Sequence, residues 1–329
     1  METDILRSSK TEGEKRSEEK LRPRNFTEFI GQKQIVDNIM VMAQSAQIRN
    51  QAMDHVLLSG PPGLGKTSLA MILAKFLDSE LHLISGPAID KKGDLAAMLS
   101  NLAPKDLLFI DEIHRMPVAV EEILYSAMED FRMDIIMGQG PTARNMQLSL
   151  PPFTLIAATT RSGLLSAPLR DRFVAHLHFD LYDLESLAKI VNDNATKLSM
   201  RITQDACSHI ARSARGTPRI ANRILRRVRD YTLIEKKREI TEKEVDYALN
   251  LMEIDKNGLD SMDRRIIHVI RTYYKGGPVG MEALCATLGE DKKTVEDVYE
   301  PWLLREGFIV RTSRGRMITK KNKFLSSEN

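Results

Sequence analysis

The segment GPPGLGKT, residues 60–67, places a lysine and a threonine directly after glycines at the spacing G-x-x-x-x-G-K-T. Gly63 and Gly65 lack a Cβ, so backbone N–H groups of this loop can converge on phosphate oxygens. Lys66 can reach the terminal phosphates of a nucleotide, and the Thr67 hydroxyl can ligate Mg²⁺. An apolar strand pattern precedes the segment and a helical pattern follows it, which favours phosphate binding over a merely structural glycine turn.

Two adjacent carboxylates, Asp111 and Glu112, follow the apolar run LLFI. Open α/β sheets bind ligands beyond the carboxyl ends of their strands. There Asp111 would hold Mg²⁺ through water, and Glu112 would orient and polarise an attacking water. The alternative interpretation is that Asp111 caps the following helix. This interpretation is less favoured, because two acidic residues stand together after the apolar run. We expect His114, nearby, to give packing or polar support rather than to bind a metal.

Two arginines, Arg170 and Arg172, flank Asp171 in the segment SAPLRDRF. A positioned guanidinium can stabilise the charge that develops on a transferred phosphoryl group. The alternative for Arg172 is a local salt bridge with Asp171.

The elements that must position these residues alternate between strand and helix patterns from about Phe26 to Tyr182. This alternation predicts an α/β fold, a parallel sheet covered by helices on both faces. Buried strands are predicted at 55–60, 81–86, 106–112, 153–160 and 175–180.

Two smaller units follow the predicted sheet. Residues 183–255 are predicted to be helical, with Pro218 opening one helix and with Thr241 and Glu244 at the spacing of a capping box. Residues 256–329 predict three helices and then a two-stranded ribbon, which is typical of a winged helix-turn-helix module. In that unit we expect Trp302 to lie in the core.

Composition describes an ordinary soluble chain of 329 residues, 42% hydrophobic, that is long enough for several domains. The net charge of +3 conceals two basic segments, 201–238 and 309–324, which suggest a polyanion partner or, for the first, a solvated face. We expect Cys207 and Cys285 to be reduced core thiols rather than a disulfide or a metal site. No membrane span or secretion signal is recognisable, and residues 1–20 predict a disordered tail.

Several motifs together resemble the AAA+ ATPases: the glycine loop, the Asp-Glu pair, a strand ending in Thr-Thr-Arg, PLRDRF and GTPR. Within that superfamily the chain resembles the RuvB family, the bacterial Holliday-junction branch-migration motors, over about residues 21–319. The segments that carry this resemblance are LRPRNFTEFIGQ, GPPGLGKTSLA, LFIDEIHRM, EEILYSAMEDFRMDIIMGQGPTAR and GTPRIANRILRRVRDY.

The resemblance implies an ATPase domain over 21–182, a helical lid over 183–255 and a DNA-binding winged helix over 256–329. It implies ATP and Mg²⁺ as cofactors, and a homo-hexameric ring around double-stranded DNA at four-way junctions. It also implies action with RuvA, alongside RuvC, in recombination and repair in the bacterial cytoplasm, at the nucleoid.

Roles carried over by motif position concern four further residues. Thr160 takes the polar sensor position beside the γ-phosphate, and Arg219 takes that of a lid arginine. A cation at a helix N-terminus opposes the helix dipole, so Arg219 does not serve helix stability. Arg172 is the finger offered to the neighbouring subunit, with Arg170 in reserve. The other nucleotide-binding candidates are Leu21, Arg22, Ser68, Glu129, Asp130, Phe131 and Tyr182.

A β-hairpin is predicted over about 131–150, because apolar residues alternate on both sides of a turn at Gly138–Pro141. Its alternative is core packing, but methionine-rich faces suit adaptable partner surfaces. The resemblance assigns the hairpin to RuvA, with Met146 and Leu148 as contact candidates.

Three arginines, Arg311, Arg314 and Arg316, crowd the turn of the predicted ribbon. Such residues have little expected internal use, whereas DNA phosphates would give them partners without sequence selection.

These features favour a translocating DNA motor. The main alternative is an ATP-switched loader or initiator, which also joins an AAA+ core to a winged helix. A small-molecule kinase is disfavoured because it explains neither the lid, nor the wing, nor the arginine pair.

Overall fold

The computed structural model describes residues 20–137, 144–255 and 257–319. The turn predicted at 138–141 and nearly all of the predicted N-terminal tail lie outside these ranges. The chain divides into two compact units, Met1–Tyr182 and Asp183–Asn329. In the described ranges, no helix is both long enough and apolar enough to cross a membrane.

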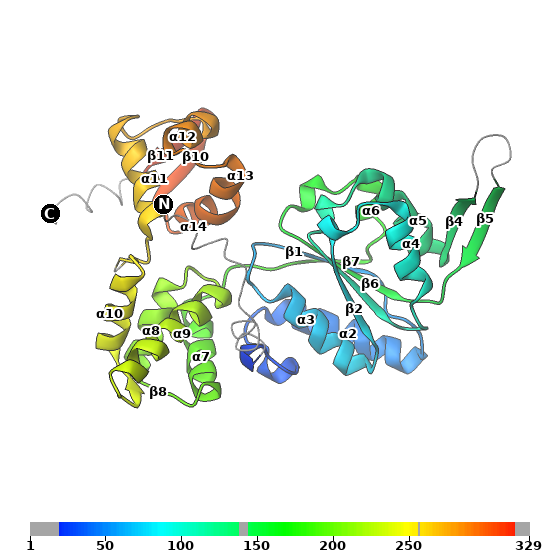
Figure 1. The fold of residues 1–329 in the computed structure, drawn as a ribbon, viewed down its shortest axis with the longest axis horizontal. Coiled ribbons are helices and arrows are strands. Elements are labelled where there is room, and N and C mark those ends of the chain that lie inside the picture. Colours follow the sequence, from blue (N-terminus) through cyan, green and yellow to red (C-terminus); the bar gives the residue numbers. More distant parts are fainter. Residues whose placement is uncertain (1–19, 138–143, 256, 320–329) are drawn as a thin grey trace. The chain divides into compact units, whose positions relative to one another are not determined.

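The first unit is built on a parallel five-stranded sheet in the order β2-β3-β6-β1-β7, as Figure 1 shows. All six residues of β6 are buried, and the predicted α/β fold is confirmed. The strands are β1 (Val56–Ser59), β2 (Leu81–Ser85), β3 (Leu107–Asp111), β6 (Thr154–Thr159) and β7 (Ala175–His178).

Helices cover both faces of this sheet, α2 and α3 on one and α4 and α5 on the other (Figure 1). In α3, Leu69, Ile72 and Leu73 are buried at helical spacing, which directs one apolar face inward. The helices are α2 (Lys33–Arg49), α3 (Lys66–Leu77), α4 (Lys92–Ser100), α5 (Val118–Asp130) and α6 (Ala167–Arg170), with short 3₁₀ turns at Phe26–Glu28, Gly86–Ala88, Ile113–Arg115 and Ser162–Leu164.

The hairpin pairs β4 (Arg132–Met137) with β5 (Arg144–Ser149), and it projects from the sheet (Figure 1). Met133 lies opposite Leu148 at its base, and Ile135 lies opposite Met146 farther out. Met133 is buried, and Leu148 packs against the same core cluster. Core packing, the alternative reading of this segment, therefore holds at the hairpin base.

The second unit begins with four helices, α7 (Leu184–Lys197), α8 (Gln204–Ser213), α9 (Pro218–Ile234) and α10 (Glu242–Leu251). A short parallel pair, β8 (Arg201–Ile202) and β9 (Glu239–Ile240), joins them. Pro218 opens α9 and Thr241 forms the capping box of α10 with Glu244, so both predicted helix starts are confirmed.

The last segment is a winged helix: α11 (Ser261–Thr272), α12 (Met281–Leu288), α13 (Lys292–Thr294), α14 (Glu300–Arg305) and the ribbon β10 (Ile309–Thr312) with β11 (Gly315–Ile318). The last of the three predicted helices is divided by a π-helical turn, η6 (Val295–Tyr299). Pro301 just beyond lacks an N–H, which interrupts α-helical hydrogen bonding there. Trp302 lies in the core as predicted.

Candidate functional site

The loop between β1 and α3 carries the glycine segment on a backbone that few other residues could adopt. Gly60, Gly63 and Gly65 have φ values of 130°, 80° and 104°. A Cβ on Gly60 would collide with the carbonyl oxygen of Phe179. Sequence reasoning singled out Gly63 and Gly65 but missed the need for a glycine at position 60. The position of Gly60 directly after the predicted strand could have indicated it.

Lys66 opens α3 and turns its ammonium back across this loop. Its Nζ donates to the carbonyl oxygens of Gly60, at 2.7 Å, and Pro61, at 2.8 Å. Lys66 is only 7% exposed, and a buried ammonium is costly unless it is paired. Thr67 and Ser68 follow in the first helical turn, where the helix N-terminus favours anions. The loop therefore offers phosphate oxygens a cation, backbone N–H groups and hydroxyls.

The two carboxylates stand at the carboxyl end of β3. Oδ1 of Asp111 accepts the backbone N–H of Glu112 at 3.0 Å. Glu112 has φ 53°, in the left-handed region, which costs a non-glycine residue roughly 1–2 kcal/mol. Such strain concentrates at functional sites, where the surrounding structure maintains it.

His114 links Glu112 to the end of β6. Its Nε2 lies 3.4 Å from Oε2 of Glu112, and its Nδ1 lies 2.9 Å from Oγ1 of Thr159. Thr159 is wholly buried and also accepts the N–H of Arg161. Sequence reasoning missed Thr159, since it selected Thr160, the next residue. His114 gives the polar support that was expected of it.

Strand order brings these groups to one edge of the sheet. β3 lies beside β6, and β6 lies beside β1. The N–H of Gly60 donates to the carbonyl of Thr159 at 3.1 Å, so Thr160 follows next to the start of the glycine loop. Asp111, Glu112 and Thr160 thus share the carboxyl edge with the phosphate-binding loop, where α/β sheets bind ligands.

Tyr182 borders the same loop, and Arg22 contacts α3. The Tyr182 hydroxyl donates to the carbonyl of Leu64 at 3.3 Å. A Cβ on Gly31 would lie 2.6 Å from the Tyr182 ring, so a glycine is needed there. Burial raises the pKa of Tyr182 above its ordinary value, which keeps the phenol a donor. Leu21 is buried, and Arg22 donates to a methionine sulfur of α3.

Arg172 is held on the far side of α5 from the glycine loop. Its Nη2 lies 2.9 Å from Oε2 of Glu129, and its Nη1 donates to the carbonyl of Pro168 at 2.7 Å. The guanidinium stacks 4.8 Å from the centre of the Tyr125 ring. The alternative salt bridge with Asp171 is therefore not the one that Arg172 makes.

Asp171 instead lies beside Arg170, at 4.0 Å, and both side chains are well exposed. The backbone after Arg172 runs to the amino edge of the sheet, where the N–H of Val174 donates to the carbonyl of His55 at 3.1 Å. His55 directly precedes β1. Arg172 is thus placed at the edge opposite to the glycine loop, and it does not serve the nucleotide site of its own chain.

Glu129, Asp130 and Phe131, which were also predicted to contact nucleotide, lie away from the glycine loop of their own chain. The Phe131 ring packs near the rings of His55 and Phe153, at the amino ends of β1 and β6. Glu129 pairs with Arg172, and Asp130 pairs with Arg132. Contact of these residues with nucleotide would require a neighbouring copy of the chain.

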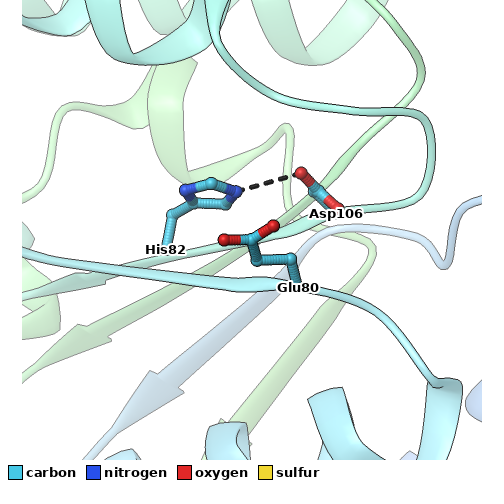
Figure 2. Close-up of side chains that lie close together, drawn as sticks. All are labelled: Glu80, His82 and Asp106. Carbon is cyan, nitrogen blue, oxygen red and sulfur yellow. Dashed lines mark hydrogen bonds and ion pairs between the residues drawn. The ribbon is translucent and has the colours of Figure 1, made fainter.

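A separate titratable cluster lies at the amino ends of β2 and β3 (Figure 2). Nε2 of His82 is 3.0 Å from Oδ2 of Asp106, and ligand atoms of Glu80, His82 and Asp106 all lie within 4.8 Å of one another. The same Asp106 oxygen accepts the N–H of Ala103. These bonds fasten the loop before β3 to the edge strand, and the cluster is remote from the nucleotide edge.

The arginines of the ribbon are not equivalent. Arg316 donates to both carboxylate oxygens of Glu300, at 2.6 and 3.1 Å, and Arg311 donates to one of them at 2.7 Å. Burial alone would raise the pKa of Glu300, but the hydrogen bonds from Arg316 and Arg311 hold it below its ordinary value. The expectation of little internal use was wrong for these two residues, whereas Arg314 is exposed.

Arg219, the predicted lid arginine, is the second residue of α9, and its side chain is exposed. Within the described ranges, it makes no hydrogen bond or ion pair. It is therefore available to an anion that approaches the start of this helix.

A glycine loop, an Asp-Glu pair and a polar strand end on one sheet edge, followed by a helical lid and a winged helix, define an AAA+ P-loop ATPase. Family models match the chain throughout: the Holliday junction DNA helicase RuvB P-loop domain at 21–179, the RuvB AAA lid domain at 182–255 and the RuvB C-terminal winged helix domain at 256–325. The chain belongs to the RuvB family.

Known relatives are similar over nearly the whole chain. A Gluconobacter oxydans protein named Holliday junction branch migration complex subunit RuvB is 52% identical, over 96% of this chain and 90% of its own length. A Kosmotoga olearia protein of the same name is 50% identical, over 94% and 90%. The solved Thermotoga maritima RuvB Holliday junction branch migration motor matches with a TM-score of 0.86 and 46% identity, over 94% of this chain and 99% of its own.

Proposed function

We propose that this chain is an ATP-driven motor that moves the branch point of Holliday junctions during recombination and repair. It acts as a homo-hexameric ring on the duplex arms, together with RuvA and alongside RuvC, in the bacterial cytoplasm. The observation that carries the proposal is the joining, in one chain, of a nucleotide-binding sheet edge to a winged helix with an exposed ribbon arginine. The names of the relatives support the same function.

The residues of the hydrolysis edge fit ATP and Mg²⁺. The buried Lys66 ammonium and the N-terminus of α3 suit phosphate oxygens, while the Thr67 hydroxyl and the Asp111 carboxylate are oxygen donors of the kind that Mg²⁺ prefers. When bound, the metal ion would neutralise charge on the phosphates. Glu112, held by His114, orients the attacking water and polarises it, and Thr160 senses the terminal phosphate.

Arg172 completes the site from a neighbouring subunit. Its exposed pair with Glu129 is of a kind worth about 0–1 kcal/mol. An arginine finger in other nucleotide hydrolases contributes roughly 10³–10⁵ in rate. We expect the guanidinium to leave Glu129 for a neighbour's phosphate when subunits assemble, so hydrolysis depends on assembly.

The accessory elements then divide the remaining work. Arg219 reads the terminal phosphate from the lid, Arg314 contacts DNA backbone with Arg311, and the outer part of the hairpin, including Met146, binds RuvA. The loader reading remains the second candidate, since it uses the same ATPase core and winged helix.

The direct test is dissociation of a synthetic four-way junction, compared with a linear duplex, with and without the cognate RuvA. We expect dissociation to be selective for the junction, to need ATP and Mg²⁺, to be stimulated by RuvA and to be lost in Lys66→Ala. ATP-dependent DNA binding without junction processing would instead identify a loader.

A further inference from the structure

Two arginines, one in the loop between α8 and α9 and one in the first turn of α9, have side chains in different environments. Arg219 is exposed at the start of α9, whereas Arg215, four residues earlier, is only 7% exposed. Arg215 has φ 54°, a conformation that residues other than glycine rarely adopt. Its side chain is buried against a neighbouring segment of the chain.

The contacts of this side chain all lie at the start of the winged helix. Nε of Arg215 donates to the carbonyl of Gly258 at 3.0 Å, and Nη2 lies 2.8 Å from Asp260 and 2.5 Å from Asp263. Asp260 is the N-cap of α11 and Asp263 is its third residue, and each side chain accepts the other's backbone N–H. One guanidinium therefore fixes the lid loop to the first turn of the DNA-binding module.

The cluster depends on this guanidinium. Asp263 is wholly buried, and burial raises the pKa of its carboxyl while Arg215 opposes the rise. Without Arg215, two neighbouring carboxylates would face each other with no counter-charge from the lid loop. Buried ion pairs are weak evidence for stability, because apolar residues can often replace them, but in some proteins they specify one arrangement of the parts.

Two further groups extend the cluster toward the DNA-binding surface. Arg223 of α9 has its pKa lowered by burial and by the charge of Arg215. Tyr299 of η6 is buried, and its pKa is raised to about 12 by burial and by the two carboxylates. The next residue is Glu300, which holds two ribbon arginines. The electrostatic influence of the Asp260 and Asp263 pair thus reaches Tyr299, the residue directly before Glu300.

We propose that Arg215 is a positioning residue that couples the nucleotide-sensing loop to the DNA-binding module. It fixes α11 to the loop that leads into α9, the helix that bears Arg219, so a displacement of this loop with the nucleotide state is transmitted to the ribbon. It touches neither nucleotide nor DNA and acts through Asp260 and Asp263. The inference rests on the proposed function, in which Arg219 reads the phosphate.

Arg215→Met tests the coupling, because methionine keeps a long apolar stem and the same backbone demand but removes the charged fork. Full-length protein with cognate RuvA is assayed for ATP turnover with and without junction DNA, and for junction dissociation per ATP consumed. We expect turnover without DNA to stay unchanged. Both DNA stimulation and dissociation per ATP should fall about tenfold, within the range of typical coupling free energies.

A second variant separates coupling from stability. Arg215→Met combined with Asp263→Asn removes the uncompensated buried charge, so the double variant should recover the unfolding temperature of the wild type. If the single variant does not fold, coupling is measured on the double variant instead. Coupling that stays lost supports the proposal. Coupling that returns with stability overturns it, since Arg215 would then be purely structural.

Arg229→Ala is the matched control, because it removes a lid arginine that pairs with Asp230 near the surface. It should behave like wild type. Equal DNA stimulation in wild type and the Arg215 variants would overturn the coupling proposal alone. A wild-type protein that hydrolysed ATP but failed to process junctions would instead overturn the proposed function, and the coupling proposal with it.

Discussion

At the scale of single residues, the groups with the clearest roles already have partners within the free chain. Lys66 is bonded to two carbonyls of its own loop, Glu112 lies near His114 and Arg172 pairs with Glu129. A ligand or a neighbouring subunit must exchange with these partners. For Arg172, leaving Glu129 costs little because ion pairs near the surface are weak. The buried Lys66 ammonium, in contrast, must gain hydrogen bonds to phosphate oxygens as strong as those it makes with the two carbonyls.

The ribbon arginines should respond differently to substitution. Arg314→Ala should weaken DNA binding for all sequences and reduce the salt dependence of binding by about one counterion, without changing stability. Arg316→Ala should lower the free energy of unfolding by roughly 3 kcal/mol, because it removes two bonds from the buried Glu300. Duplex binding across a salt series, with urea denaturation, measures both. Equal effects of the two variants on stability would contradict the assignment.

His55 gives a pH dependence whose sign follows from its contacts. Its Nδ1 accepts the N–H of Leu155 at 2.9 Å, and its Nε2 lies 3.0 Å from the carbonyl of Met128, so the ring is neutral in the fold. Burial lowers its pKa below 6.5. The unfolded chain therefore binds the proton first, and stability is lost as pH falls from about 6.5 toward the folded-state pKa. In thermal unfolding at different pH values, His55→Gln should flatten the decline below pH 6.5, and an unchanged slope would refute this.

At the scale of elements, the base of the hairpin belongs to the core, since Met133 is buried and Leu148 packs against the core cluster. Leu148→Asp should destabilise the chain by roughly 1–3 kcal/mol, because it places a charge against the core cluster. Met146→Asp, farther along the strand, should abolish RuvA binding. Pull-down with RuvA and thermal unfolding distinguish the two variants. If RuvA still binds the Met146→Asp variant, the RuvA contact lies on another surface of the chain.

The strands were predictable because each is a short apolar run between helical patterns, and β1, β3 and β6 lie within the ranges predicted for them. Contacts between distant elements were not predictable. Alternation along β5 indicates an apolar face but not how much of it the core covers. Nothing local to the ribbon indicates that Glu300, 11 residues before Arg311, holds its arginines. Adjacent threonines point to opposite faces, so Thr159 and Thr160 could not be assigned from sequence.

At the scale of the whole molecule, the proposed active site belongs to two copies of the chain. Mixing Lys66→Ala with Arg172→Ala subunits should restore turnover at interfaces where an intact loop meets an intact finger. In a random equal mixture this holds for roughly a quarter of interfaces, because each requirement is met by half of the subunits. Steady-state ATP hydrolysis measures the recovery, and each variant alone should be nearly inactive.

Arg170→Ala serves as the control in this experiment and should stay active alone. If the mixture shows no recovery while Arg170→Ala is itself inactive, Arg170 rather than Arg172 is the finger.

The positions of Arg172 and Lys66, at opposite edges of one sheet, also determine how copies can associate. In the proposed assembly, a subunit that gives its arginine to one neighbour receives an arginine from the other, so the contact is heterologous and repeats head to tail. A closed ring built from such contacts has two different faces, and its subunits all follow one another in the same direction. The polarity of the motor along DNA thus begins with the separation of one arginine from one lysine.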